Sequence, residues 1–349
     1  MQDLVSPSRE TFRRKVLISI RGLTVEFRIP RGILRAVDNV DLDIYEGEIL
    51  GLAGESGCGK SVLAHSIINQ VDPNGYIKSG KILFREEVDV LSLKPEELRK
   101  FRWKNVAIVF QGAMNSLNPV MRVGEHFLDT FLAHQSKEKE GKNQSSFSAK
   151  NRESDIFSKA KELLSRVRLD ANRVLRLFPH EASGGMKQRT IAALAMLLEP
   201  ALLILDEPTS SLDVLTQKYL LKFLLDLHQK TGQTMLFITH DLAAIAEIAD
   251  RTAIMYLGDI VEAGPTEEIF YNPRHPYTIA LLNSIPSITG KVEDVHPLPG
   301  PVPDPVNPPP GCPYHPRCPF SFDKCKSKKP SRFYFDHDKF VACHRFETK

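Results

Sequence analysis

The sequence predicts an α/β protein, in which a core sheet of short buried strands carries an inserted helical block and is followed by a small extension. Three observations lead to this prediction. Strand and helix signals alternate on both sides of the block, as in an α/β core. Between about residues 112 and 198 the pattern is instead helical and polar. After Ile285 the composition changes, because 12 of the 24 prolines lie between Pro286 and Pro319.

Length and composition set the scale of the molecule. The chain has 349 residues, of which 42% are hydrophobic and 26% are charged, as in an ordinary globular protein. This length predicts one large domain, residues 1–285, with a smaller extension, residues 286–349. The net charge of +3 gives no reason to expect nucleic-acid binding. No apolar run approaches 18 residues, so the chain is not expected to cross a membrane itself.

Short apolar runs define the expected core strands, which are Ile49–Ala53, Leu202–Leu205 and Met235–Ile238. Helices are expected over Val62–Val71 and Asp241–Ala249. The polar stretch Gln135–Asp155 is interpreted as an exposed loop. Residues 297–303 alternate proline with other residues, and proline fixes φ and lacks an N–H donor, so this segment predicts an extended linker.

A phosphate-binding loop follows the first of these strands. The segment fits the pattern G-x-x-x-x-G-K-[ST] between a strand and a helix, and its residues are Gly54, Glu55, Ser56, Gly57, Cys58, Gly59, Lys60 and Ser61. Glycines let backbone N–H groups point at phosphate oxygens, and the next helix adds its positive N-terminal end. Lys60 is expected to reach the β- and γ-phosphates of ATP, and Ser61 to bind Mg²⁺. The core is therefore predicted to be a P-loop nucleoside triphosphatase. Cys58 occupies a variable position and is given no chemical role.

Two acidic residues end a second buried strand. Asp206 is carried to the carboxyl edge of the sheet, beside the P-loop, where it can hold Mg²⁺ directly or through water. Glu207 follows it and is placed to orient or deprotonate the water that attacks ATP.

These motifs resemble those of the ABC ATPase family. Pro179–Arg189, which contains Ser183-Gly184-Gly185, resembles the family's signature sequence, with Ala182 where leucine is usual. The Walker B motif resembles Asp206-Glu207-Pro208-Thr209. The D-loop resembles Ser211-Leu212-Asp213. Gln111 matches the Q-loop glutamine and His240 the switch histidine.

The resemblance implies a role for each matched residue. Gln111 would bind Mg²⁺ as a further ligand and sense the attacking water, and His240 would hydrogen-bond the γ-phosphate. Ser183, Gly184 and Gly185 would contact the γ-phosphate of ATP bound to a second ATPase subunit, either a related chain or a second copy. Phe27 is the candidate for stacking on adenine, with a place in the strand core as the alternative.

The closest resemblance is to the ATP-binding subunits of bacterial and archaeal dipeptide and oligopeptide importers. It rests on the segments Phe110–Pro119, His275–Thr278 and Gly311–Pro319 and on the proline-rich linker. It implies a complex at the cytoplasmic face of the membrane with two permease subunits, an extracytoplasmic solute-binding protein and a second ATPase. Other solutes of such importers are nickel, glutathione and oligosaccharides. Soluble ABC ATPases of DNA maintenance or translation are the further alternative.

Four cysteines lie in the last 40 residues, namely Cys312, Cys318, Cys325 and Cys343. Their spacing matches no common zinc ribbon, because paired C-x₂-C knuckles are absent. Members of the resembled family can hold a [4Fe–4S] cluster with four cysteines in this extension, and four thiolates suit such a cluster. An iron–sulfur cluster, a zinc ion and unmetallated thiols remain open.

Overall fold

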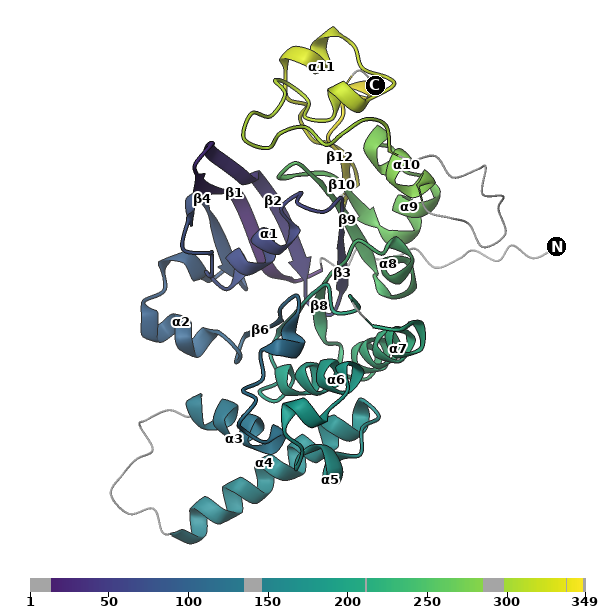
Figure 1. The fold of residues 1–349 in the computed structure, drawn as a ribbon. Helices are drawn as coiled ribbons and strands as arrows, with labels where there is room; N and C mark the ends of the chain where they lie inside the picture. The colour runs from purple at the N-terminus through teal and green to yellow at the C-terminus, as the bar shows by residue number, and fades with distance from the viewer. Residues whose placement is uncertain (1–13, 135–145, 211, 285–297, 337, 348–349) are drawn as a thin grey trace, which may run out of the picture.

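The computed structural model describes residues 14–134, 146–210, 212–284, 298–336 and 338–347. The strands form two sheets, and most helices lie around the larger one or in a block at one end of the molecule (Figure 1). The strands are β1 (Val16–Ile29), β2 (Gly32–Tyr45), β3 (Ile49–Ala53), β4 (Gly75–Phe84), β5 (Val88–Asp89), β6 (Val106–Val109), β7 (Leu202–Asp206), β8 (Thr234–Ile238), β9 (Arg251–Tyr256), β10 (Asp259–Pro265), β11 (Phe333–Asp336) and β12 (Lys339–Val341). The helices are α1 (Lys60–Ile67), α2 (Pro95–Phe101), α3 (Val123–Ala133), α4 (Ser146–Arg166), α5 (Ala171–Val174), α6 (Gly184–Ala195), α7 (Val214–Thr231), α8 (Leu242–Ile248), α9 (Thr266–Tyr271), α10 (Pro276–Asn283) and α11 (Asp323–Ser327).

The larger sheet carries the predicted core strands. Its order is β11-β12-β10-β9-β3-β8-β7-β6. Strand β3 pairs in parallel with β8 and β9, and β7 pairs in parallel with β6 and β8. The carboxyl ends of β3, β6, β7 and β8 therefore meet at one edge, which is where ligands bind in such sheets. The predicted α/β core is confirmed in this arrangement.

The smaller sheet is antiparallel, in the order β2-β1-β4-β5. Its apolar side chains pack with α1 and with one face of the larger sheet. Along β3, Leu50 and Leu52 belong to this cluster, whereas Ile49 and Ala53 belong to the cluster on the other face. Successive strand residues point to opposite faces, so burial on both faces explains why the core strands are unbroken apolar runs.

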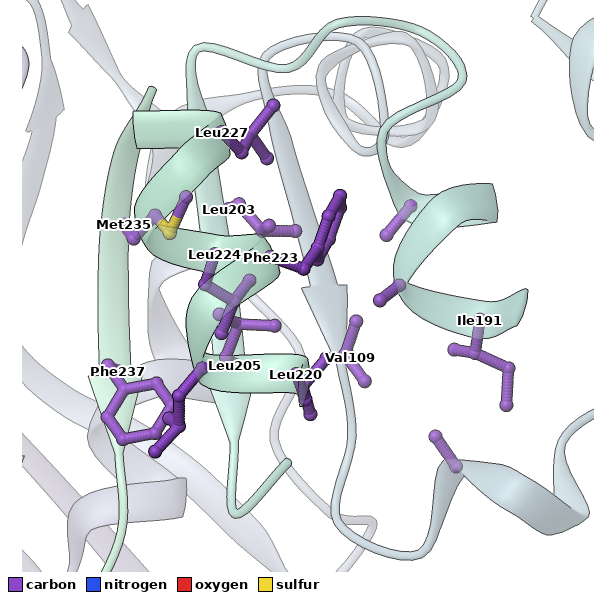
Figure 2. Close-up of a cluster of buried hydrophobic side chains, with 14 of the residues drawn as sticks. Val109, Ile191, Leu203, Leu205, Leu220, Phe223, Leu224, Leu227, Met235 and Phe237 are labelled. Carbon is purple, nitrogen blue, oxygen red and sulfur yellow. The ribbon is translucent and has the colours of Figure 1, made fainter. Parts of the chain in front are cut away.

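Helix α7 covers the second face of the larger sheet. Leu220, Phe223, Leu224 and Leu227 recur at the spacing of one helical face and lie against Leu203 and Leu205 of β7 and Met235 and Phe237 of β8 (Figure 2). Leu224 has no exposed surface. Full burial of such a side chain contributes about 1.5–3 kcal/mol, so this contact fixes the helix on the strand that ends at Asp206.

The helical block contains α3, α4, α5 and α6, at the end of the molecule away from the chain's C-terminal segment (Figure 1). The predicted loop over Gln135–Asp155 is wrong in its second half, because α4 begins at Ser146. Residues 135–145 lie outside the described residues. Polar lysine, arginine and glutamate side chains form helices well when one face is covered. Ile156 and Ala160 supply that face, and they are buried.

The C-terminal segment adds two strands to the larger sheet. Strand β12 pairs antiparallel with β10 through Glu262–Val341 and Ala263–Phe340, and β11 pairs with β12. Residues 298–303 contain neither helix nor strand, as the proline pattern predicts, whereas residue 297 lies outside the described part. The extension is therefore joined to the sheet that carries the phosphate-binding loop.

Candidate active site

The P-loop connects β3 to α1, and two of its glycines stand where no side chain fits. Gly59 has φ +108°, and a Cβ there would lie 2.1 Å from the carbonyl oxygen of Ala36. Gly54 has φ +152°, and its Cβ would lie 2.2 Å from the carbonyl oxygen of Met255. Glycine alone adopts such backbones without strain. The loop lies this close to the neighbouring strands because both positions are glycine.

The predicted phosphate-binding lysine lies inside the loop. The Lys60 ammonium donates to the carbonyl oxygens of Gly54 and Glu55, at 2.8 and 2.9 Å. Cys58 is buried beside it, with Sγ 3.6 Å from Lys60 Nζ, and burial raises the pKa of the thiol. Cys58 is therefore held as a neutral thiol, and Ser56 and Gly57 form the exposed tip of the loop.

Two of the three predicted Mg²⁺ ligands, Ser61 and Asp206, lie side by side, whereas the third, Gln111, contacts Glu207. The Ser61 hydroxyl donates to Asp206 Oδ1 at 3.0 Å. Asp206 is 1% exposed, and its Oδ2 is buried and accepts no hydrogen bond from the described residues. Mg²⁺ takes oxygen ligands and keeps several waters. A hydroxyl and a carboxylate whose second, buried oxygen accepts no hydrogen bond from the described residues suit such an ion.

Glu207 contacts the other two predicted catalytic side chains, Gln111 and His240. Its Oε2 accepts a hydrogen bond from Gln111 Nε2 at 3.0 Å, and its Oε1 lies 3.3 Å from His240 Nδ1. These residues follow β7, β6 and β8, whose carboxyl ends are adjacent. The Glu207 backbone has φ +48°, which is uncommon outside glycine and is typical of strained functional positions. Its N–H donates to the carbonyl of Ile238 at 2.9 Å, which holds this turn.

The signature residues lie at the exposed start of α6. Ser183 is the N-cap, and its hydroxyl accepts from the N–H of Met186 at 3.3 Å. Ser183 and Gly184 are exposed, whereas Gly185 packs so closely on α7 that a Cβ would lie 2.8 Å from Cγ2 of Thr216. A helix N-terminus attracts anions. This exposed terminus can therefore face a phosphate supplied by another subunit.

Phe27 lies in the smaller sheet, on β1. Its ring is half buried and covers Gly75, where a Cβ would lie 2.6 Å from Phe27 Cε1. Both the strand-core and the adenine-stacking interpretations fit a half-buried ring. The adenine-stacking role of Phe27 stays a prediction.

Three side chains at the site were not predicted. His65 Nε2 lies 3.3 Å from Asp206 Oδ2, and its position four residues after Ser61 on α1 was the available signal, because residues so spaced share a helix face. The Tyr277 hydroxyl accepts a hydrogen bond from the N–H of Glu55 at 2.9 Å. Arg317 binds the Glu55 carboxylate. No sequence spacing indicates these last two contacts, since they join residues more than 200 positions apart.

The four C-terminal cysteines surround one small cavity. Cys312, Cys318, Cys325 and Cys343 line a space of about 10 Å³, together with Phe320 and three histidines. All four are free thiols. Across the described residues, no three histidine, cysteine, aspartate or glutamate side chains are arranged closely enough to hold a metal ion. The sulfurs therefore converge without forming a closed ligand set.

Comparison with known proteins assigns the family. A family model described as "ABC transporter" matches residues 37–210, and one described as "Oligopeptide/dipeptide transporter, C-terminal region" matches residues 261–325. The "Dipeptide transport ATP-binding protein DppD" of Caldanaerobacter subterraneus is 42% identical over 95% of this chain and 98% of its own length. The chain belongs to the ATP-binding subunits of dipeptide and oligopeptide ABC transporters.

Other relatives of this ABC ATPase support the same assignment. The "Oligopeptide transport ATP-binding protein OppD" of Escherichia coli is 36% identical over 90% of this chain and 89% of its own length. A solved structure entitled as a dimeric bacterial ABC transporter cassette superposes with a TM-score of 0.60, at 25% identity, over 72% of this chain and 99% of its own. Within the described residues, no helix is long and apolar enough to cross a membrane.

Proposed function

We propose that this ABC ATPase binds ATP with Mg²⁺ on its P-loop and hydrolyses it to drive import of a peptide-like solute. The single observation that carries the ATPase step is the set of contacts around Glu207. A carboxylate between an amide and an imidazole, next to the Ser61–Asp206 pair, is suited to orient and deprotonate a water. Peptide as the solute follows from the names of the relatives, which are dipeptide and oligopeptide transport proteins.

Each residue has a defined task in this proposal. Lys60 leaves the carbonyls of Gly54 and Glu55 to contact the β- and γ-phosphates, beside the backbone N–H groups of the loop. Ser61 and Asp206 hold Mg²⁺, which supplies charge neutralisation to the phosphates. Glu207 accepts the proton of the attacking water. Gln111 and His240, which contact the two carboxylate oxygens, orient that carboxylate and respond to the γ-phosphate.

The signature residues act on a second subunit in this scheme. Ser183, Gly184 and Gly185 begin α6 at an exposed surface, where they can contact the γ-phosphate on a partner's P-loop. The solved cassette of similar fold is described as dimeric. Hydrolysis then requires two nucleotide-binding subunits, which are either two copies of this chain or this chain and a related one.

The assembly follows the importers to which the relatives belong. We assign residues 1–285 to the nucleotide-binding domain, with residues 112–198 as its helical subdomain, and residues 286–349 to the C-terminal extension. The helical subdomain would receive a membrane permease subunit at the cytoplasmic face of the membrane. Two permease subunits and an extracytoplasmic solute-binding protein complete the complex, and ATP-driven closure switches the permease between two states.

Two measurements test this function. The first compares the ATP affinity of the native chain with that of Lys60→Ala, which removes the cation aimed at the phosphates. Unchanged affinity would contradict the nucleotide site.

The second measurement purifies the complex from native membranes with ATP and Mg²⁺ and identifies its subunits. Two permeases and a second ATPase support the importer, and the solute-binding protein then gives the solute. A complex with DNA or ribosomes would overturn it.

For the C-terminal cysteines we propose a [4Fe–4S] cluster bound by Cys312, Cys318, Cys325 and Cys343. What supports it is the donor set, since four free thiols line one cavity, and four thiolates suit this cluster. Because the cavity holds only about 10 Å³, the side chains must open outward to admit a cluster. Iron, sulfide and visible absorption after anaerobic purification support the proposal. One zinc per chain, or metal-free thiols, would refute it.

A further inference from the structure

Arg317 of the C-terminal extension makes a buried ion pair with the P-loop. Its Nη1 and Nη2 donate to the two carboxylate oxygens of Glu55, at 2.7 and 3.1 Å. The Arg317 side chain is 3% exposed and that of Glu55 is 17% exposed. Nε of Arg317 donates to the carbonyl of Pro299 at 2.7 Å, and Nη1 lies 3.4 Å from the Tyr256 hydroxyl. A guanidinium with these partners is fixed in place rather than free to sample other contacts.

Glu55 is the second residue of the P-loop, and every polar group of this residue is held. Its carboxylate binds Arg317, its N–H donates to the Tyr277 hydroxyl at 2.9 Å, and its carbonyl accepts from the Lys60 ammonium at 2.9 Å. The same ammonium is expected to contact the ATP phosphates. Glu55 therefore links Arg317 to the lysine that is proposed to bind ATP, because it contacts both side chains.

We infer that Arg317 is a positioning residue for ATP binding, which neutralises Glu55 and fixes the P-loop from the C-terminal extension. This inference rests on the proposed nucleotide site. The physical reason is the charge of Glu55, because a carboxylate at the second position of an anion-binding loop repels phosphate and is costly to bury alone. Arg317 offsets both the repulsion between Glu55 and phosphate and the cost of burying the Glu55 carboxylate. It does not touch the phosphates, since both of its terminal nitrogens are engaged by Glu55.

The experiment measures ATP dissociation constants and the steady-state KM and kcat of the complete chain in its complex. Arg317→Ala is expected to raise the dissociation constant and KM for ATP about tenfold, because a charged, hydrogen-bonded partner of a buried carboxylate is lost. The value of kcat stays within about twofold, since the Glu207 carboxylate is untouched. Arg317→Lys restores one charge without the two-pronged contact and gives an intermediate affinity.

A double variant separates charge neutralisation from mere support of the fold. Glu55→Gln removes the charge that Arg317 neutralises, so Arg317→Ala combined with Glu55→Gln is expected to recover most of the lost affinity. Lys326→Ala is the matched control, because among the described residues Lys326 pairs with the exposed Asp323 alone, on the same extension. Lys60→Ala reports on the nucleotide site itself.

Each outcome decides the inference. If Lys60→Ala weakens ATP binding but Arg317→Ala does not, the positioning role is wrong and the nucleotide site stands. If Lys60→Ala has no effect, the proposed site fails instead. An Arg317→Ala defect that the double variant does not recover, or that accompanies loss of bound iron or zinc, would assign the effect to the folding of the extension and overturn the inference.

Discussion

Replacing Glu207 with glutamine tests the chemistry of the site with the smallest change in shape. Glutamine keeps one oxygen that can accept from Gln111 Nε2, but it cannot take a proton from water. Among the described residues, the carboxylate has two polar side-chain contacts, at 3.0 Å to Gln111 and at 3.3 Å to His240, and the Glu207 side chain is 15% exposed. The loop around it is held by backbone hydrogen bonds, which the substitution leaves unchanged.

The expected effect is a large loss of rate with little loss of binding. General base catalysis contributes about 10²–10⁴ in rate, which corresponds to about 2.7–5.5 kcal/mol of activation free energy. Among the described residues, the Lys60 ammonium donates to the carbonyls of Gly54 and Glu55 and to Cys58 Sγ, and no hydrogen bond joins it to Glu207. ATP affinity should therefore change by less than about threefold.

The assay combines single-turnover hydrolysis by the assembled complex with equilibrium ATP binding. Glu199→Gln is the matched control, because Glu199 also has a left-handed backbone but pairs with Lys159 in the helical block. It should hydrolyse ATP at the native rate. Hydrolysis by Glu207→Gln within threefold of native would show that Glu207 is not the base, and the contacts around it would then need another explanation.

Three further substitutions test the fold and its response to pH. Gly59→Ala should abolish ATP binding because its Cβ would meet a backbone oxygen at 2.1 Å. A Cβ at Gly57 meets no atom within 4 Å, so Gly57→Ala should lose only the affinity, about tenfold, that corresponds to the strain of an alanine at φ +79°. Leu224→Ala should lower the free energy of unfolding by about 2–5 kcal/mol. Its control is Leu215→Ala on the same helix. Because the Leu215 side chain is 67% exposed, this variant should change the free energy of unfolding by less than about 0.5 kcal/mol. Burial lowers the pKa of His275 to about 3, below the value of about 6.5 expected in the unfolded chain. Unfolded protein therefore binds more protons between these values, and stability should fall by about 2 kcal/mol from neutral pH to pH 5; His275→Gln should flatten this dependence in denaturant titrations.

The sequence predicted what local patterns encode. The buried strand before Asp206 and the glycines of the P-loop carry their own signals, because burial requires apolar runs and close backbone approach requires glycine. The loop predicted over Gln135–Asp155 was wrong from Ser146 onward, where α4 begins. Polarity alone does not distinguish a loop from a solvated helix whose apolar face lies further along the chain.

Contacts between distant segments could not be predicted in this way. The pair between Glu55 and Arg317 joins residues 262 positions apart, and neither residue type is unusual in its own segment. The contact of His65 was predictable only in part. Its spacing from Ser61 on a helix was visible in the sequence, but its contact with Asp206 depends on how α1 lies against β7. Long-range pairing requires the fold itself.

The pairing of β12 with β10 has a consequence for how this protein can be divided. A shortened chain ending near residue 285 would keep every motif for ATP binding, yet it would uncover the hydrogen-bonding edge of β10 at Glu262 and Ala263. Unpaired strand edges are sites of association between chains. Such a fragment should assemble or aggregate through this edge. The C-terminal extension is therefore needed to keep the sheet of the nucleotide-binding domain covered.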